Sequence, residues 1–567
     1  MHIKFLPAFL SSKGFDLFRN VLLSVYCQVR HKLVDVIGEE PDLGVENLRG
    51  SGTIAGETSA AYADIFTLTL VVGRTVGIGA YLVRLGQRCI QNATDAPILL
   101  TGYQALNTLM GREVYASNDQ LGGGAAIMSP NGVSHLLGEN HMDSVLAALR
   151  WLSFVPRIRD SYLPVVDITG ADMVERAIDF QPQRGMPYDP RHLVAGFTDE
   201  LDGEWVSGFF DRGSFMETLP NWARTVVCGR ARLGGIPMGV VITESRTCEK
   251  KRPADPADLQ SHESVVQQAG GVWYPDSAYK TAQAIRDVSG EGLPLMIFAN
   301  WRGFSGGMRD MFDEVLKYGA MIVDALVAYK QPVFVYIPPY AELRGGAWVV
   351  VDSTINSDVM EMYAAADHAR GGVLEANGAA SIKFRHADLL KAAHRLDPLL
   401  LELDAALAAH AAAAGTAALA AADGGTAKDG GAAAASAGGR LTDAERAAVA
   451  ARIKEREERL IGVYQQVAVQ FADLHDTPGR MVAAGAIRAV VPWTQARSYF
   501  YWRLRRRLAE FDLRKQLMRA EPAMQAQEAS RVVREWFISM GNDTAAWEDD
   551  KAVLQWMASE ATAIKVR

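Results

Sequence analysis

Short apolar runs alternate with helical patterns along the first part of the chain. Strand-like runs occupy residues 65–72 and 96–101, and residues 80–91 between them have the spacing of a helix. Glycine lies at almost every junction between these segments. Strands that alternate with helices in this way are typical of a layered α/β domain.

The same alternation returns beyond residue 208. Residues 239–244, 293–300 and 333–338 are predicted to be buried strands, and 308–330 an amphipathic helix between two of them. The intervening residues 157–202 are rich in Pro, Asp and Arg, which favours a crossing segment over a core element. Two similar α/β halves joined by this segment are therefore expected.

The last third of the chain is predicted to be helical. Residues 405–440 are almost all Ala and Gly, which favours an exposed helix or a flexible insert without chemistry of its own. Thr442 and Glu445 have the spacing of a capping box, so a long helix is expected to begin there. That helix is predicted to run through Leu460 and Phe471 and to end near Pro478.

Size and charge narrow the possible functions. A chain of 567 residues is long enough for two or more domains, and 49% hydrophobic with 22% charged residues is ordinary for a globular protein. The net charge of -8 argues against general nucleic-acid binding, so local Arg or Lys must hold any anionic ligand. The aromatic and basic run at 499–507 is accordingly interpreted as an amphipathic structural helix.

Neither the cysteines nor the apolar runs indicate a disulfide scaffold or a membrane span. The four cysteines, Cys27, Cys89, Cys228 and Cys248, are scattered and form no CxxC pair, which favours a reducing compartment and no zinc site. No apolar run approaches the length of a membrane span. Residues 1–30 resemble an organelle transit peptide, although an arbitrary start within a larger protein is the preferred interpretation.

The most informative motif is WRGFSGG, residues 301–307, between a predicted strand and a predicted helix. It fits the GxSxG pattern of a serine esterase, in which Ser305 attacks an acyl carbon. Three downstream histidines leave a catalytic triad possible: His368, His386 and His410. In the alternative, the N–H groups of Gly306 and Gly307 stabilise an oxyanion, and Arg302 binds an anion.

A second glycine pair, Gly345-Gly346, follows the predicted strand at 333–338. Glycine lets the backbone approach a ligand closely because no Cβ intervenes. Each well-placed oxyanion donor lowers a reaction barrier by about 3 kcal/mol. Two such turns in one domain favour an oxyanion site, although either turn alone is compatible with an ordinary loop.

Longer stretches of sequence resemble the carboxyltransferase domain of multidomain acetyl-CoA carboxylases. The segments that carry the resemblance include ANWRGFSGG, RDMFDEVLKYG, IPPYAELRGGAWVVVD, INSDVMEMYA, GVENLRGSGTIAGETS and FDRGSFMETL. The resemblance implies an α/β fold of two crotonase-like ββα-spiral domains with a helical C-terminal tail. It also implies a head-to-tail homodimer whose active sites lie between subunits.

The resemblance also divides the chain. Residues 1–30 stay unassigned, and 31–172 correspond to the C-terminal part of the N-domain. Residues 173–404 correspond to the core of the C-domain. The Ala/Gly-rich insert at 405–440 and the helical part at 441–567 complete the C-domain.

The implied activity is the carboxyltransferase half-reaction of acetyl-CoA carboxylase, a step of fatty acid biosynthesis. Carboxybiotin on a separate biotin carboxyl carrier domain donates a carboxyl group to acetyl-CoA, which gives malonyl-CoA, and no metal ion is expected. Arg302 is expected to bind the transferred carboxylate. The Gly306-Gly307 and Gly345-Gly346 turns are expected to polarise the biotin and thioester carbonyls.

The resemblance implies binding residues as well. Arg74, Lys383 and Arg385 are expected to bind CoA, and Lys383 and Arg385 share one face if they lie on a strand. Leu48 and Val315 are expected to line the pocket for the acyl group and for inhibitors. Alone, each of these residues would be interpreted as surface charge or core.

The chain departs from the family in one respect that leaves its activity open. It lacks the NSGARIG-type segment of the first half of the N-domain, the biotin-carrying MKM motif and a P-loop. The alternatives are therefore a truncated, weakly active or inactive dimerising fragment, and the serine esterase. A propionyl-CoA enzyme is a substrate-level alternative. The cytosol is the expected compartment, with the plastid as the alternative.

Overall fold

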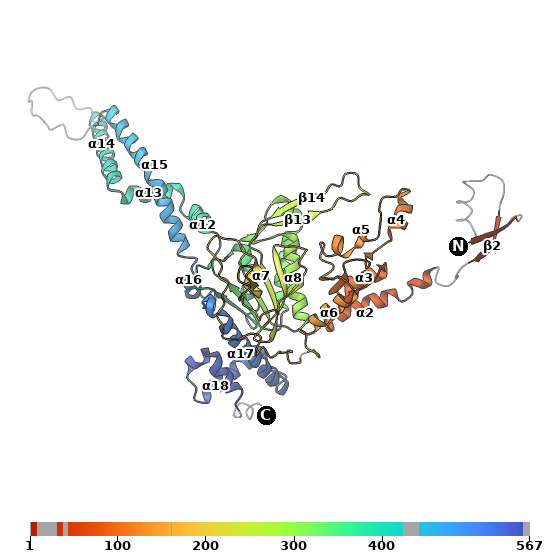
Figure 1. Cartoon of the computed structure of the whole chain (residues 1–567). Coiled ribbons are helices and arrows are strands. Elements are labelled where there is room, and N and C mark those ends of the chain that lie inside the picture. The colour runs from red at the N-terminus through yellow and green to blue at the C-terminus, as the bar shows by residue number, and fades with distance from the viewer. Residues whose placement is uncertain (1, 8–30, 38–43, 160, 423–440, 560–567) are drawn as a thin grey trace, which may run out of the picture.

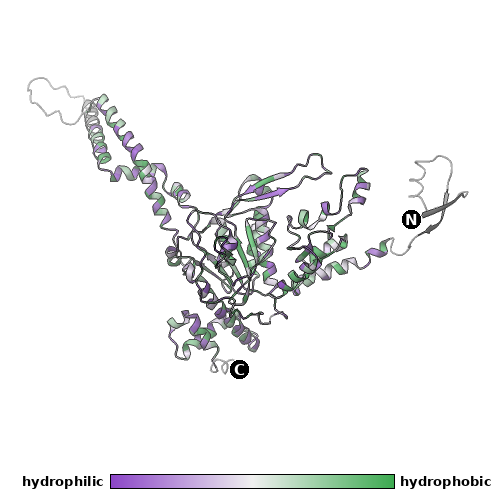
Figure 2. Ribbon diagram, viewed as in Figure 1, coloured by the Kyte–Doolittle hydropathy of each residue, from purple (hydrophilic) through white to green (hydrophobic). Residues whose placement is uncertain are grey.

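The computed structural model describes residues 2–7, 31–37, 44–159, 161–422 and 441–559. Cys27 and most of residues 1–30 lie outside these ranges, as do residues 423–440 of the Ala/Gly-rich segment. Figure 1 shows a central α/β body, a helical arm that projects from it, and a second helical group at the C-terminal end. Figure 2 shows hydrophobic residues concentrated on the central strands.

A seven-stranded sheet forms the centre, in the order β10-β11-β12-β16-β18-β20-β22. The strands are β10 (Met216–Thr218), β11 (Val226–Leu233), β12 (Ile236–Thr243), β16 (Leu295–Phe298), β18 (Val333–Ile337), β20 (Met360–Ala364) and β22 (Ala489–Val490). Strands β12, β16, β18, β20 and β22 are parallel, and every residue of β12, β16 and β18 is buried. The three buried strands predicted from continuous apolar runs are confirmed, because parallel strands are covered on both faces.

A second layer of short parallel strands lies beside the central sheet. Its strands are β15 (Val272–Trp273), β17 (Gly303–Phe304), β19 (Glu342–Arg344) and β21 (Arg370–Gly372). Strand β15 pairs with β17 and β19 with β21, and a bridge from Trp301 to Leu343 joins the two pairs. A long strand, a short strand and a helix thus repeat along the chain, which is a ββα spiral.

Helices close each repeat. They are α8 (Pro275–Gly290), α9 (Met308–Phe312), α10 (Val315–Val327) and α11 (Gly345–Val351). The single helix predicted over 308–330 is wrong, because α9 and α10 are separated by Asp313 and by Glu314, whose φ of 70° is left-handed. The chain therefore turns between the two helices instead of continuing.

The N-terminal part repeats the same pattern on a smaller scale. Strands β3 (Thr69–Val71), β5 (Cys89–Asn92) and β7 (Leu136–Gly138) form a parallel sheet, and β4 (Thr75–Val76) pairs with β6 (Ile98–Leu99). The helices of this part are α2 (Ser51–Asp64), α3 (Ile78–Leu85), α4 (Tyr103–Met110), α5 (Asp119–Gly122) and α6 (His141–Leu152). The helix predicted over 80–91 is wrong beyond Leu85, because residues from Cys89 onward pair with β3 as a strand.

A buried network of charges joins this N-terminal part to the body. Glu291, which follows α8, accepts hydrogen bonds from Arg88 and Arg230 at 2.6–2.9 Å. Next to it, Asp287 accepts from the hydroxyl of Tyr62 at 2.7 Å and lies 3.4 Å from His135. Residues before and after the crossing segment therefore share one interior.

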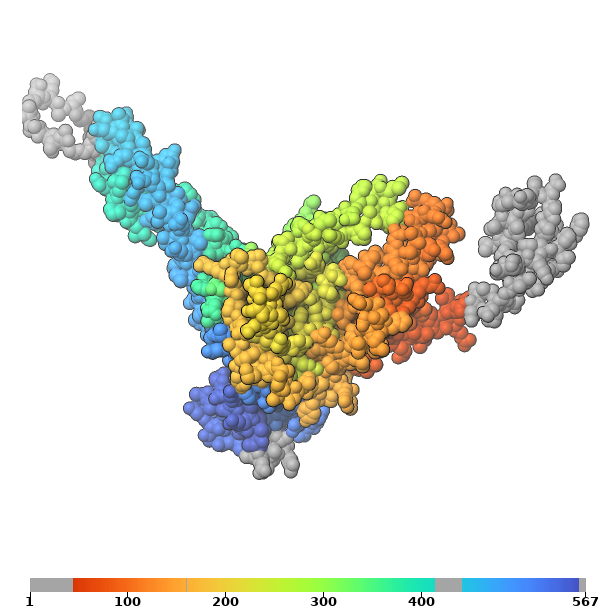
Figure 3. All heavy atoms as spheres, viewed as in Figure 1, coloured from red at the N-terminus to blue at the C-terminus, as the bar shows by residue number. Residues whose placement is uncertain are grey.

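The crossing segment and the strands that flank it are short and irregular. Residues 157–202 contain α7 (Pro190–Ala195) and β8 (Phe197–Thr198), which pairs with β9 (Trp205–Val206). Strands β13 (Cys248–Arg252) and β14 (Ser264–Gln268) form a hairpin that projects beside the N-terminal part (Figure 3). The hydroxyl of Tyr115 donates to Asp255 in the hairpin loop at 2.8 Å, which ties the two together.

The C-terminal third is helical, as predicted. Its helices are α12 (Ala376–Lys383), α13 (His386–Leu396), α14 (Pro398–Ala422), α15 (Asp443–Asp473), α16 (Pro478–Ala483), α17 (Trp493–Ala520), α18 (Ala526–Ser539) and α19 (Asp550–Met557). The capping box of Thr442 and Glu445 is confirmed at the start of α15. The Ala-rich segment is helical as far as Ala422.

Helix α17 corrects one expectation about residues 499–507. They are helical, but the helix does not divide into an apolar and a charged face, because Arg503 and Arg506 are buried. The guanidinium of Arg503 donates to Glu361, and both arginines donate to Asp550 at 2.9 and 3.0 Å. The basic run is thus used inside the fold and does not form an exposed surface for nucleic acid.

Candidate functional site

The first glycine turn is an open backbone site at the start of α9. Gly306 and Gly307 are exposed, and neither N–H has a hydrogen-bond acceptor among the described residues. A Cβ on either glycine would meet no atom within 4 Å. A ligand oxygen therefore has free access to two backbone donors at a helix N-terminus.

The second turn lies next to the first. Gly345 and Gly346 begin α11, and Gly345 has a φ of +42°, which an L side chain rarely adopts. A Cβ on Gly346 would lie 3.7 Å from the ring of Phe304, which belongs to β17 just before the first turn. The structure thus brings the two turns together.

Arg302 lies at the edge of the second layer. Its backbone N–H donates to Gly271 at 2.8 Å, which fixes the main chain. Its guanidinium is largely exposed, and its Nε is 3.8 Å from a carboxylate oxygen of Glu375, just before α12. An exposed ion pair at this distance is weak, so the guanidinium remains available for an anionic ligand.

The geometry around Ser305 does not form a serine-esterase triad. The hydroxyl of Ser305 donates to the carboxylate of Asp310 on α9, and its N–H donates to Trp273. The candidate bases lie elsewhere. The ring of His368 stacks on Tyr340, His410 accepts from the N–H of Leu441, and His386 lines a pocket with residues of α12 and α15. A serine nucleophile needs a histidine that accepts its proton, so the hydroxyl here acts as a local structural donor.

The CoA-binding candidates Lys383 and Arg385 are both exposed but do not lie on a strand. Lys383 is the last residue of α12, and Arg385 immediately precedes α13. The prediction that residues two apart share the face of a strand is therefore wrong. The chain instead turns between two helices here, with the half-buried Phe384 packed beside Phe471 of α15.

The remaining candidates are distributed over two sides of the molecule. Arg74 is exposed between β3 and β4, and Leu48 is 68% exposed in the short helix η1 (Val45–Leu48). Figure 1 shows α2 and α3, which flank these residues, on the side of the body opposite α12 and the arm. Val315 is 1% exposed at the start of α10. One chain therefore does not bring Arg74 or Leu48 to Lys383 and Arg385.

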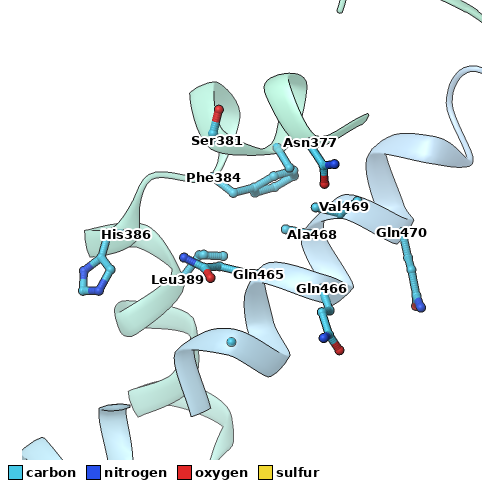
Figure 4. A pocket seen from close by; sticks show the side chains of 12 residues that line it. Asn377, Ser381, Phe384, His386, Leu389, Gln465, Gln466, Ala468, Val469 and Gln470 are labelled. Carbon is cyan, nitrogen blue, oxygen red and sulfur yellow. The ribbon is translucent and has the colours of Figure 1, made fainter. Parts of the chain in front are cut away.

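A pocket of about 800 Å³ lies at the base of the arm, between α12, α13 and α15 (Figure 4). Phe384 and Leu389 provide apolar side chains, and Gln465 and Gln466 contribute amides. Lys383 and Arg385 lie in the same two-helix turn as Phe384. The pocket thus lies beside the CoA-binding candidates, and the glycine turns do not line it.

The described ranges also bear on metal sites, membrane spans and reactive thiols. Within them, His, Cys, Asp and Glu form no group of three or more that could hold a metal ion, and no helix is both long and apolar enough to cross a membrane. Cys89, Cys228 and Cys248 are buried free thiols, and burial raises the pKa of Cys89 to about 12. A thiol with a raised pKa is a poor nucleophile.

Arg344 and Asp476 were missed by sequence reasoning. Arg344 stands directly before the second turn in the motif ELRGG, and its guanidinium is bound by Asp476, which lies 132 residues further along the chain. The short motif carries no sign of a partner so distant in sequence. Only the burial of an arginine beside a glycine pair reveals its role.

Comparison with known proteins gives a family and a fold. The family model described as "Carboxyl transferase domain" matches residues 13–508. The curated acetyl-CoA carboxylase of Dictyostelium discoideum is 52% identical over 534 residues, which cover 93% of this chain. That of Schizosaccharomyces pombe is 49% identical over 531 residues, or 94% of this chain. The matched region spans 22% of the length of each of these relatives.

Solved structures show the same architecture. The crystal structure of transcarboxylase 12S with hydrolyzed methylmalonyl-coenzyme A bound has a TM-score of 0.56 and 17% sequence identity, and the match covers 82% of this chain and 70% of that one. A second structure of transcarboxylase 12S has a TM-score of 0.54. The expected crotonase-like α/β fold is therefore confirmed.

Proposed function

Because the chain belongs to the carboxyl transferase domain family, we propose that it catalyses the carboxyltransferase half-reaction of an acetyl-CoA carboxylase. The substrates are acetyl-CoA and carboxybiotin, and the product is malonyl-CoA. The observation that carries this proposal is the pair of adjacent glycine turns, with open N–H donors at Gly306 and Gly307 and a largely exposed guanidinium at Arg302, which is only weakly paired with Glu375.

The two turns suit a reaction that passes through an enolate. Transfer of a proton from the methyl carbon of acetyl-CoA to the ureido nitrogen of biotin, which the release of CO2 from carboxybiotin would free, would place negative charge on the thioester oxygen, and one glycine turn stabilises it through fixed N–H donors. The other turn polarises the ureido carbonyl of biotin, and Arg302 binds the carboxylate that is transferred. Carboxybiotin, presented by a biotin carboxyl carrier domain, supplies the activated carboxyl group when bound. No protein nucleophile is required.

The CoA and acyl groups require residues that one chain holds apart. We assign Arg74, Lys383 and Arg385 to the phosphates of CoA and Leu48 to the acyl pocket, and we place the inner wall of that pocket at the start of α10, where Val315 is buried. In a head-to-tail homodimer, the N-terminal part of one subunit faces the body of its partner, so each site receives both sets.

Exposed apolar side chains beside the first turn favour such a partner. Met308 and Phe312 on α9 are 90% and 87% exposed, and Leu316 on α10 is also exposed. Large apolar side chains that gather on a surface mark contact sites.

A mixing experiment tests the shared site. Arg74→Ala and Arg302→Ala lie in different parts of the chain, so a mixed dimer of the two variants keeps one intact site. Coexpressed variants are expected to recover about a quarter of wild-type activity, because half of the dimers are mixed and one of their two sites is intact. Activity no higher than that of either variant alone would contradict the shared site.

A second candidate function is a weakly active or inactive dimerising fragment. The observation that favours it is the exposed apolar surface of the N-terminal part, which includes Ile54 and Ile65. A full-length partner in the dimer would then supply the active site.

For either function, the free cysteines favour a reducing compartment, and we assign the cytosol, with the plastid as the alternative.

Substitutions in the first turn test the proposal against an esterase. Carboxyl transfer from malonyl-CoA to free biotin is measured with the wild type, Arg302→Ala and Ser305→Ala. Loss of the guanidinium is expected to lower the rate by about 100-fold, whereas Ser305→Ala retains most of it. A rate that depends on Ser305 but not on Arg302 would sink the proposal, and an inactive wild type would favour the dimerising fragment.

A further inference from the structure

Arg344 is buried immediately before the second glycine turn. It is 3% exposed, and its guanidinium contacts three acceptors. Nε donates to Glu342 at 3.1 Å, and Nη1 donates to the carbonyl of Leu374 at 3.0 Å and to the carboxylate of Asp476. A buried guanidinium held by three acceptors is rigid and is not free to bind substrate.

Asp476 brings the end of the helical arm to this point. It lies just beyond the last residue of α15 (Asp443–Asp473), and its carbonyl accepts from the N–H of Gly371 in β21 at 3.0 Å. A Cβ on Gly372 would lie 2.5 Å from the Asp476 carboxylate and 3.2 Å from the Arg344 guanidinium. The ion pair therefore packs directly against Gly372 of β21, where a side chain would displace it.

The turn itself depends on its surroundings for its conformation. Gly345 has a left-handed φ of +42°, and a Cβ there would meet the carbonyl of Val373 at 2.9 Å. The next residue, Leu374, accepts from Arg344, and Glu375 is the ion-pair partner of Arg302. Residues 373–375 thus contact the second turn on one side and Arg302 of the first turn on the other.

We propose that the ion pair of Arg344 and Asp476 is a positioning device for the second glycine turn. It holds the N–H groups of Gly345 and Gly346 in place and makes their position depend on where the end of α15 lies. Arg344 and Asp476 are positioning residues because they act through the turn and do not touch substrate. The inference deepens the proposed carboxyltransferase function and rests on it for the kinetic effect, but the effect on the turn does not require activity.

The test compares two aspartates at the same helix end. Asp476→Asn removes the charge that holds Arg344. Asp473→Asn is the matched control, because Asp473 binds Arg370 of β21 through two hydrogen bonds of 2.8 and 3.0 Å and has no bond to Arg344. Each variant of the full chain is examined by amide hydrogen exchange over residues 340–352 and by kinetics of carboxyl transfer from malonyl-CoA to biotin.

Asp476→Asn is expected to accelerate exchange at the turn at least tenfold and to lower kcat about tenfold, with KM for malonyl-CoA within about twofold. Asp473→Asn is expected to leave both exchange at the turn and kcat near wild type. Equal effects of the two variants, or unchanged exchange in Asp476→Asn, would overturn the inference.

Two further controls keep the test decisive. If the wild type shows no carboxyl transfer, the proposed function fails, and the exchange data alone still decide the positioning role. If Asp476→Asn does not fold, Arg344→Lys replaces it, since a lysine retains the charge opposite Asp476 but cannot reach all three acceptors. If amide exchange at the turn in Arg344→Lys is as slow as in the wild type, the inference is refuted as well.

Discussion

Substitution of Glu291 by glutamine removes the charge at the centre of the buried network that joins the N-terminal part to the body. The carboxylate accepts from Nε of Arg88 at 2.7 Å and from Nη2 and Nε of Arg230 at 2.6 and 2.9 Å. The indole of Trp151 donates to it at 3.3 Å. All four side chains are buried, so water cannot solvate the charges that remain when the carboxylate is removed.

The expected cost follows from two guanidinium groups that lose their directly bonded counter-charge and keep only the nearby charge of Asp287. Removing one partner of a buried ion pair costs about 3–5 kcal/mol, because the remaining charge stays desolvated. Burial raises the pKa of Glu291, but the guanidinium groups of Arg230 and Arg88 lower it by more. The folded-state pKa of Glu291 therefore lies below its ordinary value. The charged carboxylate therefore stabilises the fold at neutral pH, and this contribution is lost as the pH falls through about 4 and below.

The assay is urea unfolding followed by tryptophan fluorescence, to which Trp151 contributes directly. The matched control is Glu528→Gln, which removes an exposed ion pair with Arg531 at 3.8 Å and should change the free energy of unfolding by less than about 1 kcal/mol. At neutral pH, Glu291→Gln is expected to lose about 3–5 kcal/mol, and the difference should shrink in acid. A loss below about 1 kcal/mol at neutral pH would refute the reasoning.

Three further predictions concern the turn, the CoA site and the arm. Gly345→Ala should lower kcat for carboxyl transfer by about 100-fold or more, because the turn loses its left-handed conformation; kcat within twofold of wild type would contradict this. Lys383→Ala should raise KM for malonyl-CoA about tenfold in steady-state kinetics and leave kcat unchanged, and an unchanged KM would remove Lys383 from the CoA site. His394 bridges Glu457 and Asp404 through its two ring nitrogens, and these hydrogen bonds raise the pKa of His394. The bridge therefore stabilises the arm fully below pH about 6.5, and this stabilisation is lost as the pH rises through the raised pKa. Hydrogen exchange of α15 should therefore accelerate with rising pH more in the wild type than in His394→Gln, and equal pH profiles would contradict the bridge.

The local hydrophobic pattern was sufficient to predict those elements in which every residue has the same degree of burial. The strands around residues 239–244, 293–300 and 333–338 were predictable because a buried parallel strand is continuously apolar. The helix over 80–91 was extended too far, because the strand at Cys89–Asn92 has no alternation that separates it from a helix. For the same reason, short segments such as Ile98–Leu99 cannot be delimited from sequence.

Some features of the candidate site could likewise be predicted from local sequence, and others could not. That Gly306 and Gly345 lie in turns at strand boundaries was predictable from the glycine pairs, but that the two turns are neighbours became clear only from the structure. The ion pairs of Arg344 with Asp476 and of Glu291 with Arg88 were not predictable, because their partners lie 132 and 203 residues apart and no periodicity connects them. Lys383 and Arg385 were placed on a strand because spacing alone does not reveal that the chain turns between two helices.

A carboxyltransferase moves a carboxyl group and leaves the thioester intact, whereas an esterase cleaves the thioester. The most direct measurement follows the chain with malonyl-CoA labelled in its free carboxyl group, in the presence and absence of biotin, and identifies the products. For the proposed carboxyl transfer, the expected products are acetyl-CoA and labelled carboxybiotin, formed only when biotin is present. Labelled malonate and free CoA, formed at the same rate with or without biotin, would contradict it.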